Sequence, residues 1–189
     1  MSKRIIGVDV DLTVCPSDQG WINWLNERSS KYDPSMWLEF KSSTIKLPYN
    51  LGSMFAEEIE DPMEYWRELD YTELKPIKGS VEKLKELSTY FDIVFISAIK
   101  GQHTKSKYYW LEQHFPFNKG YIATKEKFLM NNSVCAMTDD RLDNLQGFDQ
   151  HKRVFYKTPY SQSETCGVGY VIDDWESFSV KDFCDQYLN

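Results

Sequence analysis

The chain has 189 residues, of which 41% are hydrophobic and 27% are charged, so it can bury a core of ordinary size without depending on disulfides. Its 29 acidic residues outnumber its 22 basic ones, which gives a net charge of −7. This balance argues against duplex nucleic acid as a partner, because affinity for a duplex comes from basic side chains that neutralise phosphates. It leaves room for a small phosphorylated ligand held by a few local cations.

Nothing in the sequence predicts export or a membrane partner. The first residues lack the apolar region of a signal peptide, and no segment approaches the ~20 apolar residues that cross a bilayer. The cysteines, at positions 15, 135, 166 and 184, form no CxxC pair and predict reduced thiols in an intracellular, cytoplasmic protein. The sequence leaves the oligomeric state open, a homodimer included.

The predicted elements begin with a short strand and a long helical insertion. Residues 4–8 contain three β-formers and stop at an acidic cluster, which is typical of a strand end. Residues 17–72 are helical and rich in aromatic side chains, some of them at the spacing of one helix face. A loop at 76–80 then ends in a serine suited to cap a helix at 81–90.

The second half of the chain alternates strands with helices. Residues 93–96 are a continuously apolar run, of the kind that is buried on both faces of a parallel sheet. Further strands are predicted at 120–123, 134–137 and 153–156, helices at 104–114, 125–130 and 175–187, and a loop at 158–169. This alternation predicts an α/β fold with a parallel sheet and right-handed crossovers.

Chemically active side chains follow four of the predicted strands. In chain order they are Asp9 and Asp11, then Ser97, then Lys125 and Lys127, and finally Asp139 and Asp140. Because the carboxyl ends of parallel strands meet at one edge of a sheet, where ligands bind, we expect these side chains to share one site.

The residue types at this edge indicate phosphoryl transfer. Four crowded carboxylates repel one another, so we expect a divalent cation between them, and oxygen ligands without Cys or His favour Mg²⁺ over zinc. One carboxylate beside the ion can attack phosphorus, and an acid two residues further on can act as general acid and base. A lysine and a hydroxyl can neutralise the phosphoryl oxygens.

The order of the motifs resembles that of the haloacid-dehalogenase-like (HAD) phosphatases: Asp-x-Asp-x-Thr, then Ser, then Lys, then Asp-Asp. A receiver domain uses similar residues, but its acidic pair comes first and its lysine last. Within the HAD phosphatases, the chain is most similar to the 5′(3′)-deoxyribonucleotidases over residues 76–144. The segments that carry this similarity are 76–79, 97–100, 107–112, 114–116, 124–127 and 139–144.

This resemblance implies an HAD-like α/β core at 1–14 and 76–189, with a small helical cap inserted at 15–75. It implies Mg²⁺-dependent hydrolysis of a small molecule, a nucleoside monophosphate, through an aspartyl-phosphate. The implied catalytic residues are Asp9 as nucleophile, Asp11 as general acid and base, and Ser97 and Lys127 as phosphoryl contacts. The implied Mg²⁺ ligands are Asp9, the main-chain carbonyl of Asp11 and Asp140, with Asp139 in support. The implied substrate contacts are Lys100, Lys125, Ala98 and Trp66.

Several alternatives remain open at this point. Either Lys125 or Lys127 could reach the phosphoryl group, and the resemblance favours Lys127. Lys100 could equally be an exposed loop lysine. Aromatic rings of the insertion could stack on a nucleobase, but each is more simply explained by packing inside the cap. Neither the base nor the sugar follows from the sequence, and Leu12 and Ser17 depart from the pattern of relatives.

Two other functions also remain open. The chain could be a phosphatase of another small ester or of a polynucleotide 3′ end, although its acidic charge weighs against a polymer. It could instead be an inactive HAD-like module that binds a nucleotide or a partner, although all the catalytic residue types are present.

Overall fold

The computed structural model describes residues 2–29, 52, 57–98, 103–161 and 167–188. In these residues, six parallel strands form one sheet in the order β3-β2-β1-β4-β5-β6. The strands are β1 (Ile5–Val8), β2 (Asp92–Ser97), β3 (Gly120–Ala123), β4 (Ala136–Asp139), β5 (Arg153–Tyr156) and β6 (Tyr170–Ile172). The parallel α/β fold predicted from the alternating pattern is therefore confirmed.

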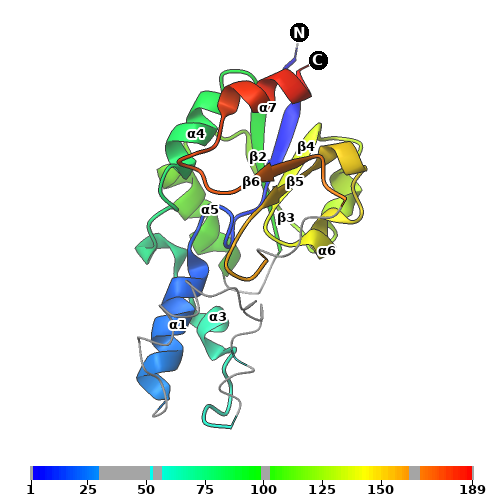
Figure 1. Ribbon diagram of the computed structural model, residues 1–189. Coiled ribbons are helices and arrows are strands. Elements are labelled where there is room, and N and C mark those ends of the chain that lie inside the picture. The colour runs from blue at the N-terminus through cyan, green and yellow to red at the C-terminus, as the bar shows by residue number, and fades with distance from the viewer. Residues whose placement is uncertain (1, 30–51, 53–56, 99–102, 162–166, 189) are drawn as a thin grey trace.

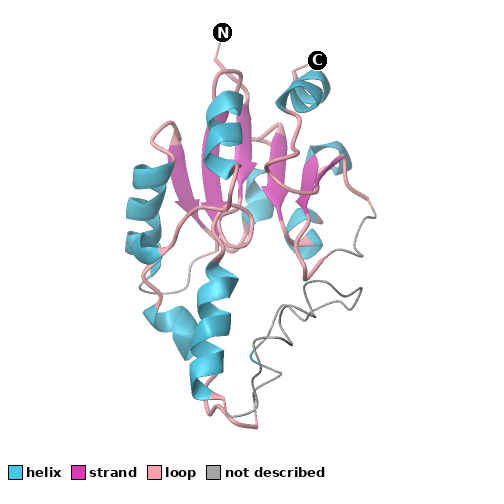
Figure 2. Ribbon diagram, turned by 60° about the vertical axis from the view of Figure 1, so that its left-hand side comes forward, coloured by secondary structure: helices cyan, strands magenta, loops and turns pink. Residues whose placement is uncertain are grey.

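Helices cover both faces of this sheet (Figure 2). Strand β2 shows why its sequence is apolar at successive positions. Ile93 and Phe95 belong to the hydrophobic cluster on one face, whereas Val94 and Ile96 pack in the cluster on the other face. A strand that is buried on both sides cannot alternate between apolar and polar residues. The helices are α1 (Ser17–Arg28), α3 (Glu64–Glu68), α4 (Ser80–Leu87), α5 (His103–His114), α6 (Leu142–Leu145) and α7 (Val180–Tyr187), with short 3₁₀ turns η2 (Tyr71–Glu73), η3 (Lys127–Met130) and η4 (Gln150–Lys152).

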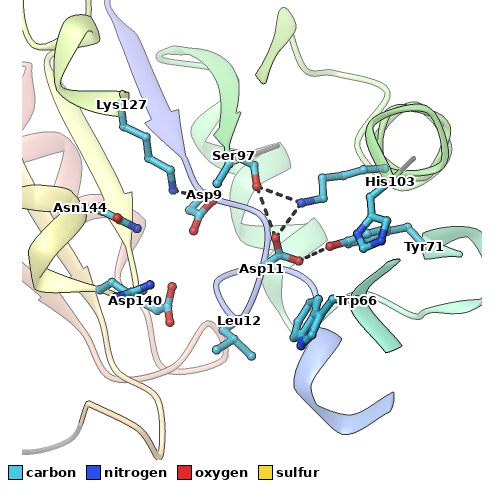
Figure 3. Close-up of a pocket in the computed structure, with 13 residues that line it drawn as sticks. Asp9, Asp11, Leu12, Trp66, Tyr71, Ser97, His103, Lys127, Asp140 and Asn144 are labelled. Atoms are coloured by element: carbon cyan, nitrogen blue, oxygen red, sulfur yellow. Dashed lines mark hydrogen bonds and ion pairs between the residues drawn. The ribbon is translucent and has the colours of Figure 1, made fainter. Parts of the chain in front are cut away.

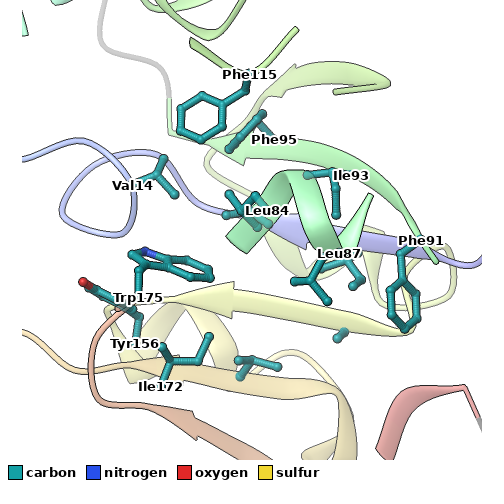
Figure 4. Packing of buried hydrophobic residues seen from close by; sticks show 14 of the residues in the cluster. Val14, Leu84, Leu87, Phe91, Ile93, Phe95, Phe115, Tyr156, Ile172 and Trp175 are labelled. Atoms are coloured by element: carbon teal, nitrogen blue, oxygen red, sulfur yellow. The ribbon is translucent and has the colours of Figure 1, made fainter. Parts of the chain in front are cut away.

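The larger hydrophobic cluster ties the end of the chain to the turn that follows β1 (Figure 4). Trp175 stacks on Tyr156 with ring centroids 5.6 Å apart, and its indole N–H donates to the carbonyl of Thr13 at 2.7 Å. Leu84 of α4 is fully buried in the same cluster. This packing holds the turn after β1 against the core.

The structure corrects three of the predicted elements and adds one strand. The strand expected at 134–137 lies two residues later, because the Val134 N–H is still bonded to Met130. The helix expected at 125–130 is the single 3₁₀ turn η3. The helix expected at 175–187 begins at Val180, where the Ser179 hydroxyl accepts from the N–H of Asp182 and caps it. The short strand β6 had not been predicted.

The strand order places β1 at the centre, with β2 and β3 on one side and β4 to β6 on the other. Successive strands are therefore added toward one edge of the sheet from β1 to β3 and toward the other edge from β4 to β6, so the strand order reverses between β1 and β4. In open α/β sheets, ligands bind beside such a switch point, beyond the carboxyl ends of the strands. Helices α1 and α3 lie beyond these carboxyl ends (Figure 1).

Helices α1 and α3 share a hydrophobic cluster that is separate from the clusters on the sheet. Its buried members are Trp21, Ile22, Leu25, Ile59, Tyr65 and Tyr160. Tyr160 comes from the chain beyond β5, and its hydroxyl donates to Asp18 of α1 at 2.7 Å. The described part of the insertion is thus packed on itself and tied to the core. Among the described helices, none is long and apolar enough to cross a membrane.

Candidate active site

A tight turn after β1 carries the first two acidic residues. The N–H groups of Val14 and Cys15 both donate to the carbonyl of Val10, at 3.0 and 2.9 Å. Leu12 adopts a left-handed backbone with φ of 60°, a conformation that is uncommon for a leucine and often marks a functional site. The turn presents Asp9 and Asp11 at the carboxyl edge of the sheet, with their carboxylates facing different partners (Figure 3).

Asp9 faces a buried lysine at the switch point. The Lys127 ammonium lies 2.8 Å from Asp9 Oδ1 and 2.7 Å from Asp139 Oδ2. Asp139 is completely buried, and its oxygens also accept from the Asn144 amide, at 2.9 and 3.1 Å, and from the N–H of Arg141, at 3.0 Å. With its oxygens bonded in this way, Asp139 holds Lys127 against Asp9.

The pKa values on this side of the site reflect burial and crowding. Burial raises the pKa of Asp9 to about 6, Lys127 opposes this rise, and Asp139 and Asp11 add to it. Burial also raises the pKa of Asp140 well above its usual range, and Asp139 and Asp9 raise it further. Burial alone would lower the pKa of Lys127, but the two carboxylates on either side outweigh this effect and raise it.

The crowded carboxylates fit a divalent cation. Asp9, Asp139 and Asp140 each offer an oxygen, and these three atoms lie within 4.8 Å of one another. The donor set is all oxygen, as Mg²⁺ prefers, and Mg²⁺ sites in proteins usually need only one or two carboxylates. Both oxygens of Asp139 already accept hydrogen bonds, from Lys127, Asn144 and the N–H of Arg141, whereas the contact of Asp9 with Lys127 is through Oδ1. Asp9 and Asp140 are therefore the better placed ligands.

Asp11 faces away from this cluster, toward residues of α5 and η2. Its Oδ2 accepts from the Lys107 ammonium at 2.7 Å, and its Oδ1 accepts from the Tyr71 hydroxyl at 2.5 Å. The Ser97 hydroxyl lies 3.1 Å from the same ammonium and 3.5 Å from Asp11 Oδ2. Burial acts to raise the pKa of Asp11, but Lys107 and Tyr71 outweigh it, so this pKa lies below its usual value.

These side chains line one cavity of about 200 Å³ between the sheet edge and the helices beyond it. The lining residues are Asp9, Asp11, Leu12, Trp66, Tyr71, Ser97, Ala98, His103, Lys107, Lys127, Asp140, Arg141 and Asn144. The cavity has a charged floor at the strand ends and an apolar side made by Leu12 and Trp66 (Figure 3). It can therefore hold a small ligand with one anionic group.

The structure brings together most of the residues that the sequence singled out. Asp9, Asp11, Ser97, Lys127 and Asp140 line the cavity, as do Ala98 and Trp66. Lys125 is exposed and is not among the lining residues, so of the two lysines only Lys127 contacts the carboxylates. Lys100 lies outside the described residues. The Asp11 carboxylate is not part of the acidic cluster, and metal binding through its main-chain carbonyl stays a prediction.

Some aromatic residues of the insertion are buried in its own hydrophobic cluster, and others line the cavity. Trp21 and Tyr65 are buried in the cluster of α1 and α3, as expected for residues that fill a cap. Trp66 lies edge-on to Trp21, with ring centroids 5.4 Å apart, and also lines the cavity. Trp37 and Tyr49 lie outside the described residues.

Sequence reasoning missed several cavity residues. Lys107 is 2% exposed and lies on the buried stripe of α5 with His103, Trp110 and Leu111. A lysine at a helix position otherwise reserved for buried residues was the available signal. Tyr71 carried no signal, because it reaches the site only through the return of the insertion to the core. His103, which the sequence analysis did not single out, also lines the cavity.

Comparison with known proteins agrees with this geometry. The sequence model of the family described as 5′ nucleotidase, deoxy (pyrimidine), cytosolic type C protein matches residues 3–179. A 5′(3′)-deoxyribonucleotidase of Clostridium acetobutylicum is 25% identical over 190 residues, which cover 98% of this chain and 97% of that protein.

Two solved structures share the fold. A protein from Burkholderia xenovorans LB400, described as a haloacid dehalogenase-like hydrolase, has a TM-score of 0.64 at 13% identity, with both chains covered completely. YfnB of Bacillus subtilis, described as an HAD hydrolase bound to magnesium, has a TM-score of 0.55 at 17% identity, over 93% of this chain and 96% of that one.

Proposed function

The chain belongs to the family of deoxy (pyrimidine) 5′ nucleotidases of cytosolic type C and is an HAD-like phosphatase, and from this premise we propose that it hydrolyses a nucleoside monophosphate through an aspartyl-phosphate on Asp9. The observation that carries the proposal is the contact of the Asp9 carboxylate with the buried Lys127 ammonium, 2.8 Å apart, beside Asp140 at the switch point of the sheet. The substrate we propose is a deoxyribonucleotide, the class named in the Clostridium relative.

In the first half-reaction, an Asp9 oxygen attacks phosphorus and the bond between phosphorus and the nucleoside oxygen breaks. Asp11, which takes up a proton when the anionic phosphate group binds beside it, gives this proton to the departing oxygen, so that the nucleoside leaves as an alcohol and Asp11 becomes a carboxylate. In the second half-reaction, Asp11 takes a proton from water, the resulting oxygen attacks phosphorus, and the bond to Asp9 breaks. Phosphate leaves, Asp9 is again a carboxylate and Asp11 again carries a proton.

The other polar residues act on the phosphoryl group. Lys127 balances the negative charge of Asp9 as the phosphoryl group approaches, and it needs no reorganisation because Asp139 already holds it at 2.7 Å. The Ser97 hydroxyl donates to a phosphoryl oxygen. Asp9 and Asp140 are the residues that would hold Mg²⁺, which would supply positive charge to the phosphoryl oxygens.

We propose that residues 15–75 act as a cap over this chemistry. The described helices α1 and α3 lie beyond the strand ends (Figure 1), and Trp66 of α3 lines the cavity. Its indole ring can contact the base, and the helices beyond the strand ends can limit the entry of water.

Replacing the nucleophile tests the proposal. We expect Asp9→Asn to lower Mg²⁺-dependent release of phosphate by on the order of 10³-fold or more, because an amide cannot form the intermediate. Asp143→Asn is a matched control, since Asp143 is exposed on α6 and does not line the cavity. Full activity of Asp9→Asn would rule out the aspartyl-phosphate route.

A further inference from the structure

We propose that Lys107 is a positioning residue that, with Tyr71, holds the Asp11 carboxylate in place for proton transfer. This inference rests on the proposed function above. It concerns two residues of different elements: Lys107 comes from α5, and Tyr71 comes from the η2 turn by which the insertion returns to the core.

The contacts fix each oxygen of the carboxylate separately. Lys107 Nζ lies 2.7 Å from Asp11 Oδ2, and the Tyr71 hydroxyl lies 2.5 Å from Oδ1. Figure 3 shows the Asp11 carboxylate turned toward Tyr71 and away from Asp140. A carboxylate with a donor on each oxygen has one rotamer available, so its position relative to Asp9 is set before any substrate binds.

The burial of Lys107 indicates that its charge contributes to the site and that the side chain does more than fill space. Its side chain is 3% exposed, and lysine is rarely buried unless it is paired. A residue that only filled space between α5 and the sheet would be apolar, because burying an ammonium is costly. The compensating contacts are Asp11, the Ser97 hydroxyl at 3.1 Å, and the face of the Tyr71 ring, whose centroid is 4.6 Å away.

A rival role for Lys107 is direct contact with the phosphoryl group, since its ammonium also reaches Ser97. The two roles have different chemical consequences. Proton transfer from Asp11 matters for a nucleoside, whose alkoxide leaves poorly, and matters little for p-nitrophenolate, which leaves without a proton. Contact with the phosphoryl group would assist both substrates equally, because they share that group.

The test compares the two leaving groups in Lys107→Met, which removes the charge and keeps the length. We expect kcat/KM for the best nucleotide to fall by about 10²-fold or more, and kcat/KM for p-nitrophenyl phosphate to fall by less than about tenfold. Tyr71→Phe should show the same bias with a smaller loss. Lys105→Met is the matched control, because Lys105 is exposed on the same helix and should behave as wild type.

Other outcomes would overturn the inference. Equal losses on both substrates would assign Lys107 to the phosphoryl group, and unchanged kinetics would deny it a role. If Lys107→Met does not fold, Tyr71→Phe decides the question, because the absence of a leaving-group bias there would contradict the proposed positioning. Failure of the proposed function is a separate result, since the wild-type protein would then release no phosphate from any nucleotide, whether or not it hydrolyses p-nitrophenyl phosphate.

Discussion

At the scale of single residues, two buried lysines each pair with different carboxylates of the site, which divides its negative charge into two groups. Lys127 contacts Asp9 and Asp139, and Lys107 contacts Asp11. The nucleophile and the proton carrier that we propose are therefore kept in different electrostatic surroundings, although only one residue separates them. Such a division lets two neighbouring carboxylates take different roles.

Removing Lys127 tests this division. We expect Lys127→Met to lower kcat/KM by about 10²-fold or more, because positive charge is lost where the phosphoryl group binds. The free energy of unfolding should also fall, by about 3 kcal/mol, because a buried ion pair loses one partner. Phosphate release and denaturant unfolding measure the two effects. Lys119→Met, at an exposed position, is the control, and wild-type behaviour of Lys127→Met on both measurements would contradict the assignment.

Residues at strand ends could be predicted, and residues that reach the site from the side could not. Asp9 directly follows β1, Ser97 is the last residue of β2 and Lys127 lies in the turn η3 after β3, so the parallel pattern alone brings them to one edge of the sheet. Lys107 and Tyr71 reach the same cavity from a helix stripe and from the end of the insertion, and their placement depends on tertiary packing. In the sequence, the only sign that the buried face of α5 reaches the site is the lysine at position 107.

At the scale of elements, the start of α4 depends on one glycine. Gly79 has φ of +81°, and a Cβ placed on it would lie 3.0 Å from the backbone nitrogen of Glu176 and 3.1 Å from the carbonyl carbon of Trp175. Both the positive φ and the close approach exclude a side chain. The segment from Trp175 packs on the turn after β1 through Thr13, so this contact also supports the site.

We therefore expect Gly79→Ala to lower the free energy of unfolding by about 1–3 kcal/mol, because alanine is strained at this backbone conformation and close to the facing backbone. Chemical denaturation measures the change. Gly120→Ala is the matched control, since a Cβ there meets nothing within 4 Å. Equal stability of the two variants would show that the backbone at Gly79 relaxes freely.

The elements that the sequence missed are those with the weakest local signal. Strand β6 has three residues, which is too short for a periodic pattern, and among the described strands it pairs with β5 alone. The helix expected at 175–187 begins only at Val180, and Trp175 and Phe178 pack into the core from the loop before it. Tertiary packing decided both cases.

At the scale of the whole molecule, the strand order brings Asp9 of the first strand beside Asp140 of the fourth. The acidic cluster therefore depends on the pairing of β1 with β4, two strands that are far apart in the sequence. The cluster is costly without a cation, since burial and mutual repulsion raise the pKa values of both residues. Cation binding should therefore raise the free energy of unfolding of the whole fold.

We expect Mg²⁺ to stabilise the protein by about 2.7 kcal/mol at about 100 times its Kd, measured by denaturant unfolding. The effect should be smaller well below pH 6 than well above it, because protons then compete for Asp9, whose pKa is about 6. Asp140→Asn should remove the effect and stabilise the metal-free protein, whereas Asp143→Asn should change neither. Equal stabilisation of Asp140→Asn and wild type would place the ion elsewhere.

The most direct test of the central claim is phosphate release from a panel of 5′- and 3′-monophosphates, deoxy and ribo, with Mg²⁺ and again with EDTA. We predict rapid release from one or more deoxyribonucleotides that EDTA abolishes. If every nucleotide stays intact while a simple aryl phosphate is hydrolysed, the catalytic residues are assigned correctly and the substrate is wrong. If no phosphate is released from any compound in the presence of Mg²⁺, the nucleotidase account is contradicted.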